Sequence, residues 1–389
     1  MEIRELTPEE RFDAELISTV AFHGRIEDLQ KKKEEVLKEQ AEDWGAFSDQ
    51  GKLMAHIINN HYTVHFDGVQ VPCGGIGAVS TLPEYREEGC IRAIFGRLLH
   101  RARERGEILS ALYPFCQAFY RKFGYETVCK ENVYTFAPEV LREYSFGGKA
   151  VMYAPEDNLQ PYMELYTQFA ARYNLAAVRS ESMMREHLKG NCYQERKFTY
   201  LLSEEETSVA YLTFVDVKGE KGPHLKVQDL AWEGRKGFEA ILGFLSRFTA
   251  DYARIDLPLP LDIELLSLIH SWKAYDIEKR TEQSYMVRVV NVPELLKRLA
   301  VQEGTVFTIR VQDELLPENC GTWKVTHGSA EAVSEPPDLI VSIQALAQMT
   351  VGEVSLYEAA LRSDVTVVNM SGTLSGVFVR KPLYMAEHF

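Results

Sequence analysis

The chain has 389 residues, more than one ordinary domain needs, and this length indicates two or three domains. Apolar residues make up 46% of the chain and aromatic residues 11%, enough to bury real cores, and no run of about 18 apolar residues predicts a membrane-spanning helix. The net charge is −14, from 43 basic and 57 acidic side chains. This balance argues against nucleic acid and favours cationic small molecules or peptides as partners, although solubility alone would also explain it.

Six cysteines are scattered along the chain and never form a C-x-x-C pair. Their spacing argues against a zinc ribbon and a disulfide framework and fits the reducing cytoplasm. The first residues, "MEIRELTPEERFD", are charged and contain no apolar stretch typical of a secretory signal, so we expect a cytoplasmic protein. His61 and His65 share the face of a predicted strand, but no acidic or cysteine ligand accompanies them at a recognisable spacing, so we expect no metal.

The first 138 residues alternate between strand and helix patterns. Thr7 and Glu10 form a capping box at the start of a helix, and an Asp67–Gly68 turn predicts a hairpin because Asp-Gly supplies the positive φ angles that such turns need. Apolar residues at helical spacing follow from Ile91, with Gly106 suited to the helix end. Further expected elements are strands at 60–66, 69–82, 108–113 and 131–138 and a short helix at 116–124.

A second α/β pattern begins near Phe146. Within it, residues 224–248 repeat the order strand, glycine-bearing loop and amphipathic helix about 150 residues after its first occurrence, which indicates an internal duplication. The last hundred residues place strands before helices, an α+β layout. The chain closes with "LSGVFVRKPLYMAEHF", which is apolar to its final residue, so we expect this end to be docked rather than frayed.

The stretch "VSTLPEYREEGCIRAIFGRLL", residues 79–99, predicts a strand, a loop and the start of a helix. Such a helix start leaves backbone N–H groups free and forms an anion site, and Gly89 lets a ligand approach the backbone closely. The charged side chains of the loop are Arg86, Glu87, Glu88 and Arg92. The two glutamates would oppose a phosphate unless they turn to solvent, and an ordinary strand-to-helix turn explains the same spacing.

This stretch resembles the acyl-CoA pyrophosphate loop of the GNAT acetyltransferases, whose pattern is R/Q-x-x-G-x-G/A. Arg86 and Gly89 match the pattern, while Ile91 replaces the small residue at its end. The Eis-type (enhanced intracellular survival) branch accepts a larger residue there, followed by an arginine such as Arg92. The branch also carries a Y-x-x-F-G-Y segment, present here as "YRKFGY" from Tyr120.

The resemblance covers essentially all of the chain and implies an α/β (α+β) fold in three parts. These are a GNAT acetyltransferase domain at 1–138, a degenerate GNAT-like domain at 139–288 and a sterol-carrier-protein-like domain at 289–389, which ends in the active-site carboxylate. In the second part, "WEGRKGF" at 232–238 lacks the loop spacing, so we expect no second cofactor site there. Proteins of the family form symmetric assemblies, often hexamers, so a homo-oligomer is expected.

The resemblance also implies the roles of individual residues. Acetyl-CoA would be bound by Val79, Ser80, Thr81, Arg86, Glu87, Glu88, Gly89, Cys90, Ile91 and Arg92. Tyr120 would be the general acid that protonates the departing thiolate, and the free carboxylate of Phe389 would be the general base. The acceptor, a cationic amine such as an aminoglycoside, a polyamine or a lysine side chain, would meet Phe22, Trp44, Phe47, Tyr113, Phe115 and Glu387. For each aromatic residue, including Tyr120, packing in a core is the alternative.

Two other functions remain open at this point. The third part could bind a lipid or acyl ligand, with the two α/β parts as scaffold; trimming Phe389 would then leave acetyl transfer unaffected. Alternatively, the chain could be an interaction module that holds acetyl-CoA as a structural ligand or sensor, without releasing thiol to any amine.

Overall fold

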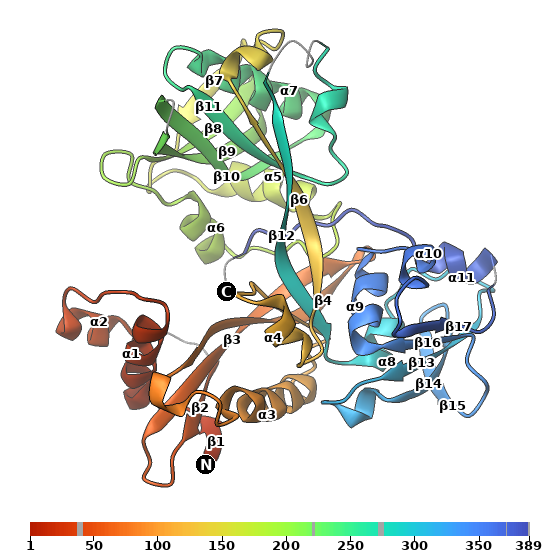
Figure 1. Ribbon diagram of the computed structural model, residues 1–389. Helices are drawn as coiled ribbons and strands as arrows, with labels where there is room; N and C mark the ends of the chain where they lie inside the picture. Colours follow the sequence, from red (N-terminus) through yellow and green to blue (C-terminus); the bar gives the residue numbers. More distant parts are fainter. Residues whose placement is uncertain (37–41, 220–221, 271–275, 371, 388–389) are drawn as a thin grey trace. The chain divides into compact units, whose positions relative to one another are not determined.

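The computed structural model describes residues 1–36, 42–219, 222–270, 276–370 and 372–387, which form two compact units (Figure 1). Unit 1 contains Met1–Val128, Ser284–Lys381 and Glu387, and unit 2 contains Cys129–Gln283 and Pro382–Ala386, as far as these ranges are described. The boundaries fall inside strands β6 (Glu126–Phe136) and β12 (Glu278–Val289), so each of these strands contributes to both units. Among the described residues, no helix is both long and apolar enough to cross a membrane.

The N-terminal part of unit 1 is a mixed sheet with helices on both faces. Its elements are β1 (Glu2–Glu5), η1 (Pro8–Glu10), α1 (Arg11–Ala21), α2 (Leu29–Val36), β2 (Glu42–Phe47), β3 (Leu53–Phe66), β4 (Val69–Thr81), η2 (Pro83–Tyr85), α3 (Cys90–Glu104), β5 (Leu109–Leu112) and α4 (Gln117–Arg121). The strand order is β1-β2-β3-β4-β5-β12, and only the β4–β5 pair, which α3 connects, is parallel.

Local sequence signals account for these elements. The backbone N–H of Thr7 donates to the Glu10 carboxylate at 2.9 Å, as the capping box predicts. Asp67 and Gly68 form the turn between β3 and β4 with φ angles of 48° and 82°. Neighbouring residues of β2 face opposite sides of the sheet: the side chains of Trp44 and Ala46 join the core under α3, and that of Phe47 joins the core under α1.

The C-terminal part of unit 1 is an α+β domain, as predicted. Its elements are α8 (Val292–Leu296), β13 (Phe307–Gln312), η7 (Pro317–Asn319), β14 (Gly321–Thr326), β15 (Ser329–Val333), β16 (Leu339–Ser342), α9 (Ile343–Val351), α10 (Leu356–Ala359), β17 (Val365–Val367) and α11 (Gly372–Val377). The sheet order is β15-β14-β13-β16-β17, in which only β13 and β16 pair in parallel.

A buried ion pair joins the two parts of unit 1. Arg288 of β12 has no exposed side-chain surface, and its Nη2 lies 2.8 and 2.6 Å from the carboxylate oxygens of Asp313, which follows β13. Its Nη1 donates to the carbonyl oxygen of Phe123, just after α4. Gly124 has a φ of 83°, and a Cβ at this position would collide with the guanidinium. The end of α4 is therefore fixed by Arg288.

Unit 2 repeats the arrangement of the N-terminal sheet. Its elements are η3 (Pro138–Leu141), β7 (Lys149–Met152), α5 (Gln160–Ala170), α6 (Glu181–Leu188), β8 (Lys197–Glu204), β9 (Thr207–Gly219), β10 (Gly222–Trp232), α7 (Gly234–Leu245), η4 (Ser246–Phe248), β11 (Arg254–Pro260) and η5 (Leu265–Ser267). The strand order is β6-β11-β10-β9-β8-β7. Strands β9 and β10 are antiparallel, as β3 and β4 are. Strands β10 and β11 are parallel and joined by a helix, as β4 and β5 are. The predicted duplication is thus confirmed by the topology.

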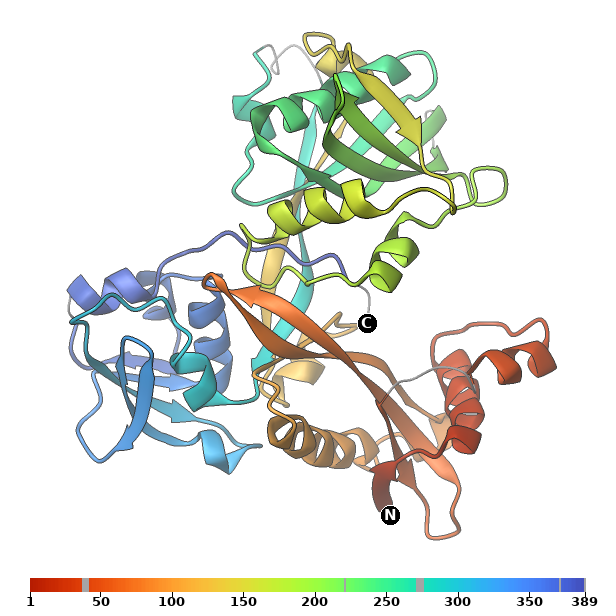
Figure 2. The same ribbon diagram turned by 180° about the vertical axis from the view of Figure 1, so that it is seen from behind.

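Helices cover both faces of the unit 2 sheet. Tyr162 of α5 packs on Tyr211 of β9 with ring centroids 5.7 Å apart, while Phe248, after α7, packs on Phe214 at 5.6 Å. Positions 211 and 214 of one strand face opposite sides of the sheet, so α5 and α7 lie on different faces. Figure 2 shows α5 and α6 from behind.

Candidate functional site

The strand-loop-helix stretch from β4 to α3 forms the candidate site. Within the described residues, strand β4 pairs with β5 from Cys73 to Ile76, and the last five residues of β4 do not pair with β5. The edge of β4 is therefore open just before the loop. Gly89 is the N-cap of α3 with a φ of 81°, and nothing lies within 4 Å of the position that a Cβ would take. The left-handed backbone, not a lack of room, is what favours glycine there.

The N-terminus of α3 supplies the electrostatics of an anion site. The first N–H groups of a helix have no partner within the helix, and the helix dipole adds positive potential. Arg86 and Arg92 are exposed beside these amides, together with Glu87, and Lys122 is exposed across the pocket. Three cations against one carboxylate, next to free amides, suit a ligand that carries phosphate groups.

A cavity of about 660 Å³ lies at this helix start. Of the predicted cofactor residues, those that line it are Val79, Ser80, Thr81, Arg86, Glu87, Gly89, Cys90, Ile91 and Arg92. Glu88 is exposed and is not part of the lining. The cavity is also lined by Ala21, Phe22, Tyr85, Phe115, Phe119, Lys122 and Phe123, of which only Phe22 and Phe115 were expected in the active site.

The thiol of Cys90 is not arranged for nucleophilic attack. Cys90 is buried, and burial, followed by the charge of Glu88, raises the pKa of the thiol. A neutral thiol is a poor nucleophile, so a covalent acyl-cysteine at this position is disfavoured.

Tyr120 lies in α4, among the aromatic side chains that border the cavity. Its ring meets those of Phe115 and Phe119 with centroids 5.2 and 5.1 Å apart, and both of these rings line the cavity, whereas Tyr120 itself is buried behind them. Burial, followed by the neighbouring Cys116, raises the pKa of the phenol. The phenol therefore keeps its proton at neutral pH. Sequence reasoning missed Phe119 and Phe123, although both lie inside the "YRKFGY" region or next to it.

The remaining predicted acceptor residues lie in different surroundings. Trp44 and Phe47 are buried in the cores under α3 and α1, and the indole of Trp44 donates to Glu42 at 2.8 Å. Tyr113 is exposed and packs edge-on against Tyr285 at 5.8 Å. Glu387 is buried. Burial of Tyr62, and second to it the negative charge of Glu387, raises the pKa of Tyr62 to about 12. Phe389 lies outside the described residues.

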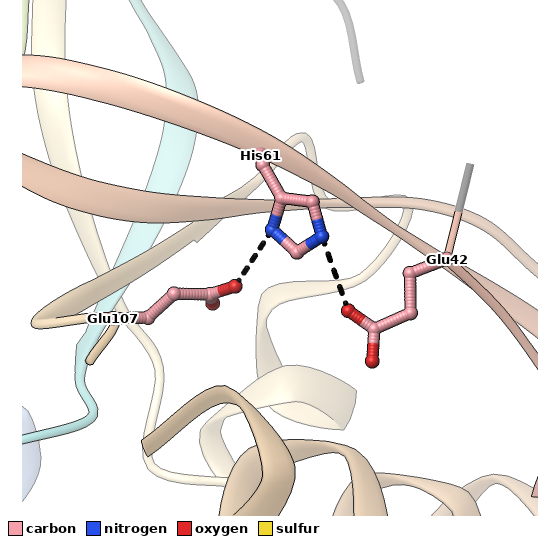
Figure 3. A group of neighbouring side chains, drawn as sticks. All are labelled: Glu42, His61 and Glu107. Carbon is pink, nitrogen blue, oxygen red and sulfur yellow. Dashed lines mark hydrogen bonds and ion pairs between the residues drawn. The ribbon is translucent and has the colours of Figure 1, made fainter. Parts of the chain in front are cut away.

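The structure places two glutamates, Glu42 and Glu107, next to His61, although no glutamate lies at a metal-ligand spacing from His61 in the sequence (Figure 3). His61 Nδ1 lies 2.9 Å from Glu107 Oε1, and His61 Nε2 lies 3.3 Å from Glu42 Oε2. Each ring nitrogen thus faces a different carboxylate, and Arg105 also donates to Glu42. In this arrangement the cluster is an ion-pair network, because a metal would have to displace Arg105 and turn the imidazole. That no metal is needed stays a prediction.

A larger cavity, of about 870 Å³, lies between the end of α4 and the C-terminal domain of unit 1. Arg121 and Asp364 are among its lining residues, and both are committed to other partners: Arg121 pairs with Glu126 and Asp364 with Arg362. These two charges are therefore engaged within the protein, so the cavity at the start of α3 is the stronger candidate for the chemistry.

Comparison with known proteins agrees with this placement. Residues 2–128 match the family described as "Acetyltransferase (GNAT) domain", and residues 292–386 match "Sterol carrier protein domain". An "Uncharacterized N-acetyltransferase" of Streptomyces avermitilis is 25% identical over 306 residues, which cover 74% of either chain.

Two solved structures share the fold over 100% of both chains. They are a GCN5-related N-acetyltransferase from Anabaena variabilis, with a TM-score of 0.86 and 19% identity, and Eis1 from Mycobacterium abscessus, with a TM-score of 0.82 and 20% identity. At these identities the likeness concerns the fold alone. A GNAT domain implies acetyl-CoA as co-substrate and an amine as acceptor. The chain therefore contains a GNAT acetyltransferase domain at residues 2–128 and a sterol carrier protein domain at residues 292–386.

Proposed function

We propose that the chain transfers an acetyl group from acetyl-CoA directly to the primary amine of a cationic acceptor, either a small molecule of the aminoglycoside or polyamine type or a lysine side chain. The observation that carries the proposal is the cavity at the start of α3, where an open strand edge, a left-handed Gly89 and exposed cations meet. The acidic balance of the chain, −14, favours cationic acceptors.

The cofactor would bind along β4 and across the helix start. The extended pantetheine arm would pair with the open edge at Val79–Thr81, as a further strand would. The pyrophosphate would accept hydrogen bonds from the backbone amides between Arg86 and Ile91, with Arg86 and Arg92 adding charge. The side chains of Glu87 and Glu88 are exposed, so neither places a buried negative charge next to the phosphates.

In the reaction, the neutral amine attacks the thioester carbonyl and a C–N bond forms. The C–S bond then breaks, the coenzyme A thiolate takes up a proton, and the nitrogen loses one. Tyr120, as general acid, would donate to the thiolate. Because a thiol has a reference pKa of about 8.5 and a phenol about 10, full transfer from an ordinary phenol is uphill by roughly 2 kcal/mol, and the raised pKa of Tyr120 increases this cost. The phenol would therefore act largely by stabilising the thiolate through a hydrogen bond.

The α-carboxylate of Phe389 would be the general base. Its reference pKa of about 3.5 lies roughly 7 units below that of an alkyl ammonium, so in water it is a weak base toward the acceptor. Burial raises the pKa of a carboxyl and lowers that of an amine, which narrows the gap. Glu387, which is buried two residues before the terminus, would add negative charge that attracts the acceptor.

The parts of the chain would divide the work. Residues 1–138 would bind acetyl-CoA, residues 139–288 would form a scaffold and a wall of the acceptor pocket, and residues 289–389 would supply the terminal carboxylate. In the second part, α7 begins at Gly234, and Arg235 in its first turn pairs with Glu239 at 2.7 Å.

Release of free thiol from acetyl-CoA, measured against a panel of amines, tests the proposal. Tyr120→Phe and deletion of Phe389 should each lower kcat about a hundredfold, the typical share of a general acid or base. Tyr125→Phe is the matched control, because it removes a buried phenol of the same segment, which hydrogen-bonds Ser110 Oγ at 2.7 Å, and its kcat should stay close to the wild type. Binding of acetyl-CoA without thiol release to any amine would instead favour a sensor.

A further inference from the structure

The larger cavity, of about 870 Å³, has a volume typical of small-molecule sites. The residues that line it all belong to unit 1. One wall is the end of α4, with Arg121, Lys122 and Gly124, and the other is the C-terminal domain, from the end of β13 to the start of α9. The two walls are in contact, because Gln344 Nε2 donates to the carbonyl oxygen of Arg121 at 3.0 Å. The cavity is therefore part of one packed unit.

Three ion pairs neutralise most of the charge around this cavity. They are Arg288–Asp313, Arg121–Glu126 and Asp364–Arg362. Each pair joins one cation to one carboxylate, so together they leave no net charge. The Nε of Arg288, which is buried, has no hydrogen-bond partner within the described residues. A side chain that lines the cavity thus retains an unused N–H donor.

The charges that remain favour an anionic ligand. Lys122 and Arg310 line the cavity, are exposed and have no carboxylate partner in the part of the chain that the structure describes. Arg310 Nε donates to Thr322 Oγ1 at 3.1 Å, which holds the guanidinium at the wall without neutralising it. Against these two cations stands the exposed carboxylate of Glu314. The dipole of α9, which begins at this cavity, adds positive potential. In a chain whose net charge is −14, this local surplus favours a small molecule with several carboxylate or phosphate oxygens.

Lys122 connects this cavity to the one at the start of α3, because its side chain lines both. It is the C-cap of α4, and a lysine carries its ammonium on a flexible stem of four carbons. One ammonium neutralises an anion in only one of the two cavities at a time. A ligand that draws Lys122 into the larger cavity therefore removes a cation from phosphates bound in the other.

We propose that the larger cavity binds a small polyanion, through Lys122, Arg310 and the start of α9, and that this ligand weakens acetyl-CoA binding by taking Lys122 away from the cofactor. The effect on acetyl-CoA rests on the proposed placement of the cofactor at the start of α3, whereas the polyanion site does not. An exposed charge contact changes an affinity by up to about fivefold, and we expect an effect of this size. Because such coupling is reciprocal, acetyl-CoA should weaken polyanion binding by the same factor.

Calorimetric titration of the full-length chain with citrate, and separately with inorganic phosphate, tests the site in the absence of acetyl-CoA. The ionic strength is held constant with sodium chloride, so that general screening does not contribute. We expect saturable binding of at least one of these anions, and binding about fivefold weaker in Arg310→Met. Arg97→Met is the matched control, because Arg97 is an exposed arginine of α3 that lines neither cavity and has no carboxylate partner within the described residues. This variant should bind the anion like the wild type.

Titration with acetyl-CoA at increasing concentrations of the anion that binds tests the coupling. The Kd for acetyl-CoA should rise about fivefold and then level off, because both ligands are bound in the final state. In Lys122→Met the Kd should already be raised about fivefold without the anion, and the anion should not raise it further. A Kd that keeps rising in proportion to the anion, equally in the wild type and in Arg310→Met, would show direct competition at the start of α3 and overturn the inference.

The remaining outcomes separate the inference from the proposed function. Saturable binding of neither anion, or equal losses of affinity in Arg310→Met and Arg97→Met, would overturn the polyanion site. Binding of the anion with no change in the Kd for acetyl-CoA would overturn the coupling. A chain that binds the anion through Arg310 but does not bind acetyl-CoA would contradict the proposed function instead, and the polyanion site alone would stand.

Discussion

The buried pair of Arg288 and Asp313 allows a sharp prediction about what holds unit 1 together. The perturbations are Arg288→Met, which keeps much of the side-chain volume, and Asp313→Ala. Neither Arg288 nor Asp313 has exposed side-chain surface, so either change leaves one charge in the interior without its partner.

The two variants should not cost the same. Without Arg288, Asp313 still accepts from Asn319 Nδ2 at 2.9 Å and from the amides of Leu315 and Leu316 at 3.0 and 3.2 Å. Without Asp313, Arg288 keeps only the carbonyl of Phe123 as a hydrogen-bond partner within the described residues, and its Nε already has none there. Breaking a buried pair costs about 3–5 kcal/mol, so we assign about 3 to Arg288→Met and about 5 to Asp313→Ala.

Thermal unfolding followed by circular dichroism at one scan rate measures the difference. In a unit of this size, 1 kcal/mol shifts the midpoint by about 2–4 °C, so the expected drops are roughly 6–12 °C and 10–20 °C. Arg310→Met, an exposed arginine on β13, is the control and should change stability by less than about 0.5 kcal/mol. A midpoint for Arg288→Met within about 2 °C of the wild type, or a larger loss for Arg288→Met than for Asp313→Ala, would refute the reasoning.

Two further predictions concern the loop and a buried carboxyl. Gly89→Ala forces a residue with a Cβ into the left-handed region at a cost of roughly 1–2 kcal/mol, and it should weaken acetyl-CoA binding about tenfold. Gly96→Ala lies in the interior of α3 with open space around it, so it should raise stability by about 0.5–1 kcal/mol and leave binding unchanged. Calorimetric titration and thermal unfolding of both variants separate the two effects. Burial, followed by repulsion from Glu282, raises the pKa of Glu131 to about 7, so the stability tied to its protonated form is complete below about pH 4.5 and is lost as pH rises through 7. Glu131→Gln should therefore stabilise the chain by up to roughly 3 kcal/mol at pH 8 and have no effect at pH 4.5, and urea unfolding that shows the same difference at both pH values would contradict this assignment.

Local signals in the sequence predicted the elements that frame the candidate site. The Asp67–Gly68 turn and the apolar face of α3 each depend on a few neighbouring residues, and the structure contains both. Strand β3 was expected only from residue 60 but begins at Leu53. A shift of register between His56 and Ile58 interrupts the alternation of its side chains, which hides the first half of the strand from a period-two pattern.

Contacts between distant residues could not be predicted. Glu107 lies 46 positions after His61, and Asp229 lies 155 positions before Tyr384, and no spacing rule links either pair. Strand β12, which leads into the C-terminal domain, pairs with β5 of the N-terminal sheet, with Met286 opposite Leu112, and both parts belong to one unit. Such pairings arise from the packing of whole elements, so they become visible only in three dimensions.

Isothermal titration of the full-length chain with acetyl-CoA tests the central claim most directly. The account predicts binding at micromolar strength that is lost when Arg86 and Gly89 are replaced together, because the exposed cation and the left-handed N-cap of α3 are both removed. The matched variant Gly96→Ala should bind like the wild type. If the wild-type chain does not bind acetyl-CoA at millimolar concentration, the cavity at the start of α3 is not a cofactor site and the proposed transfer reaction is contradicted.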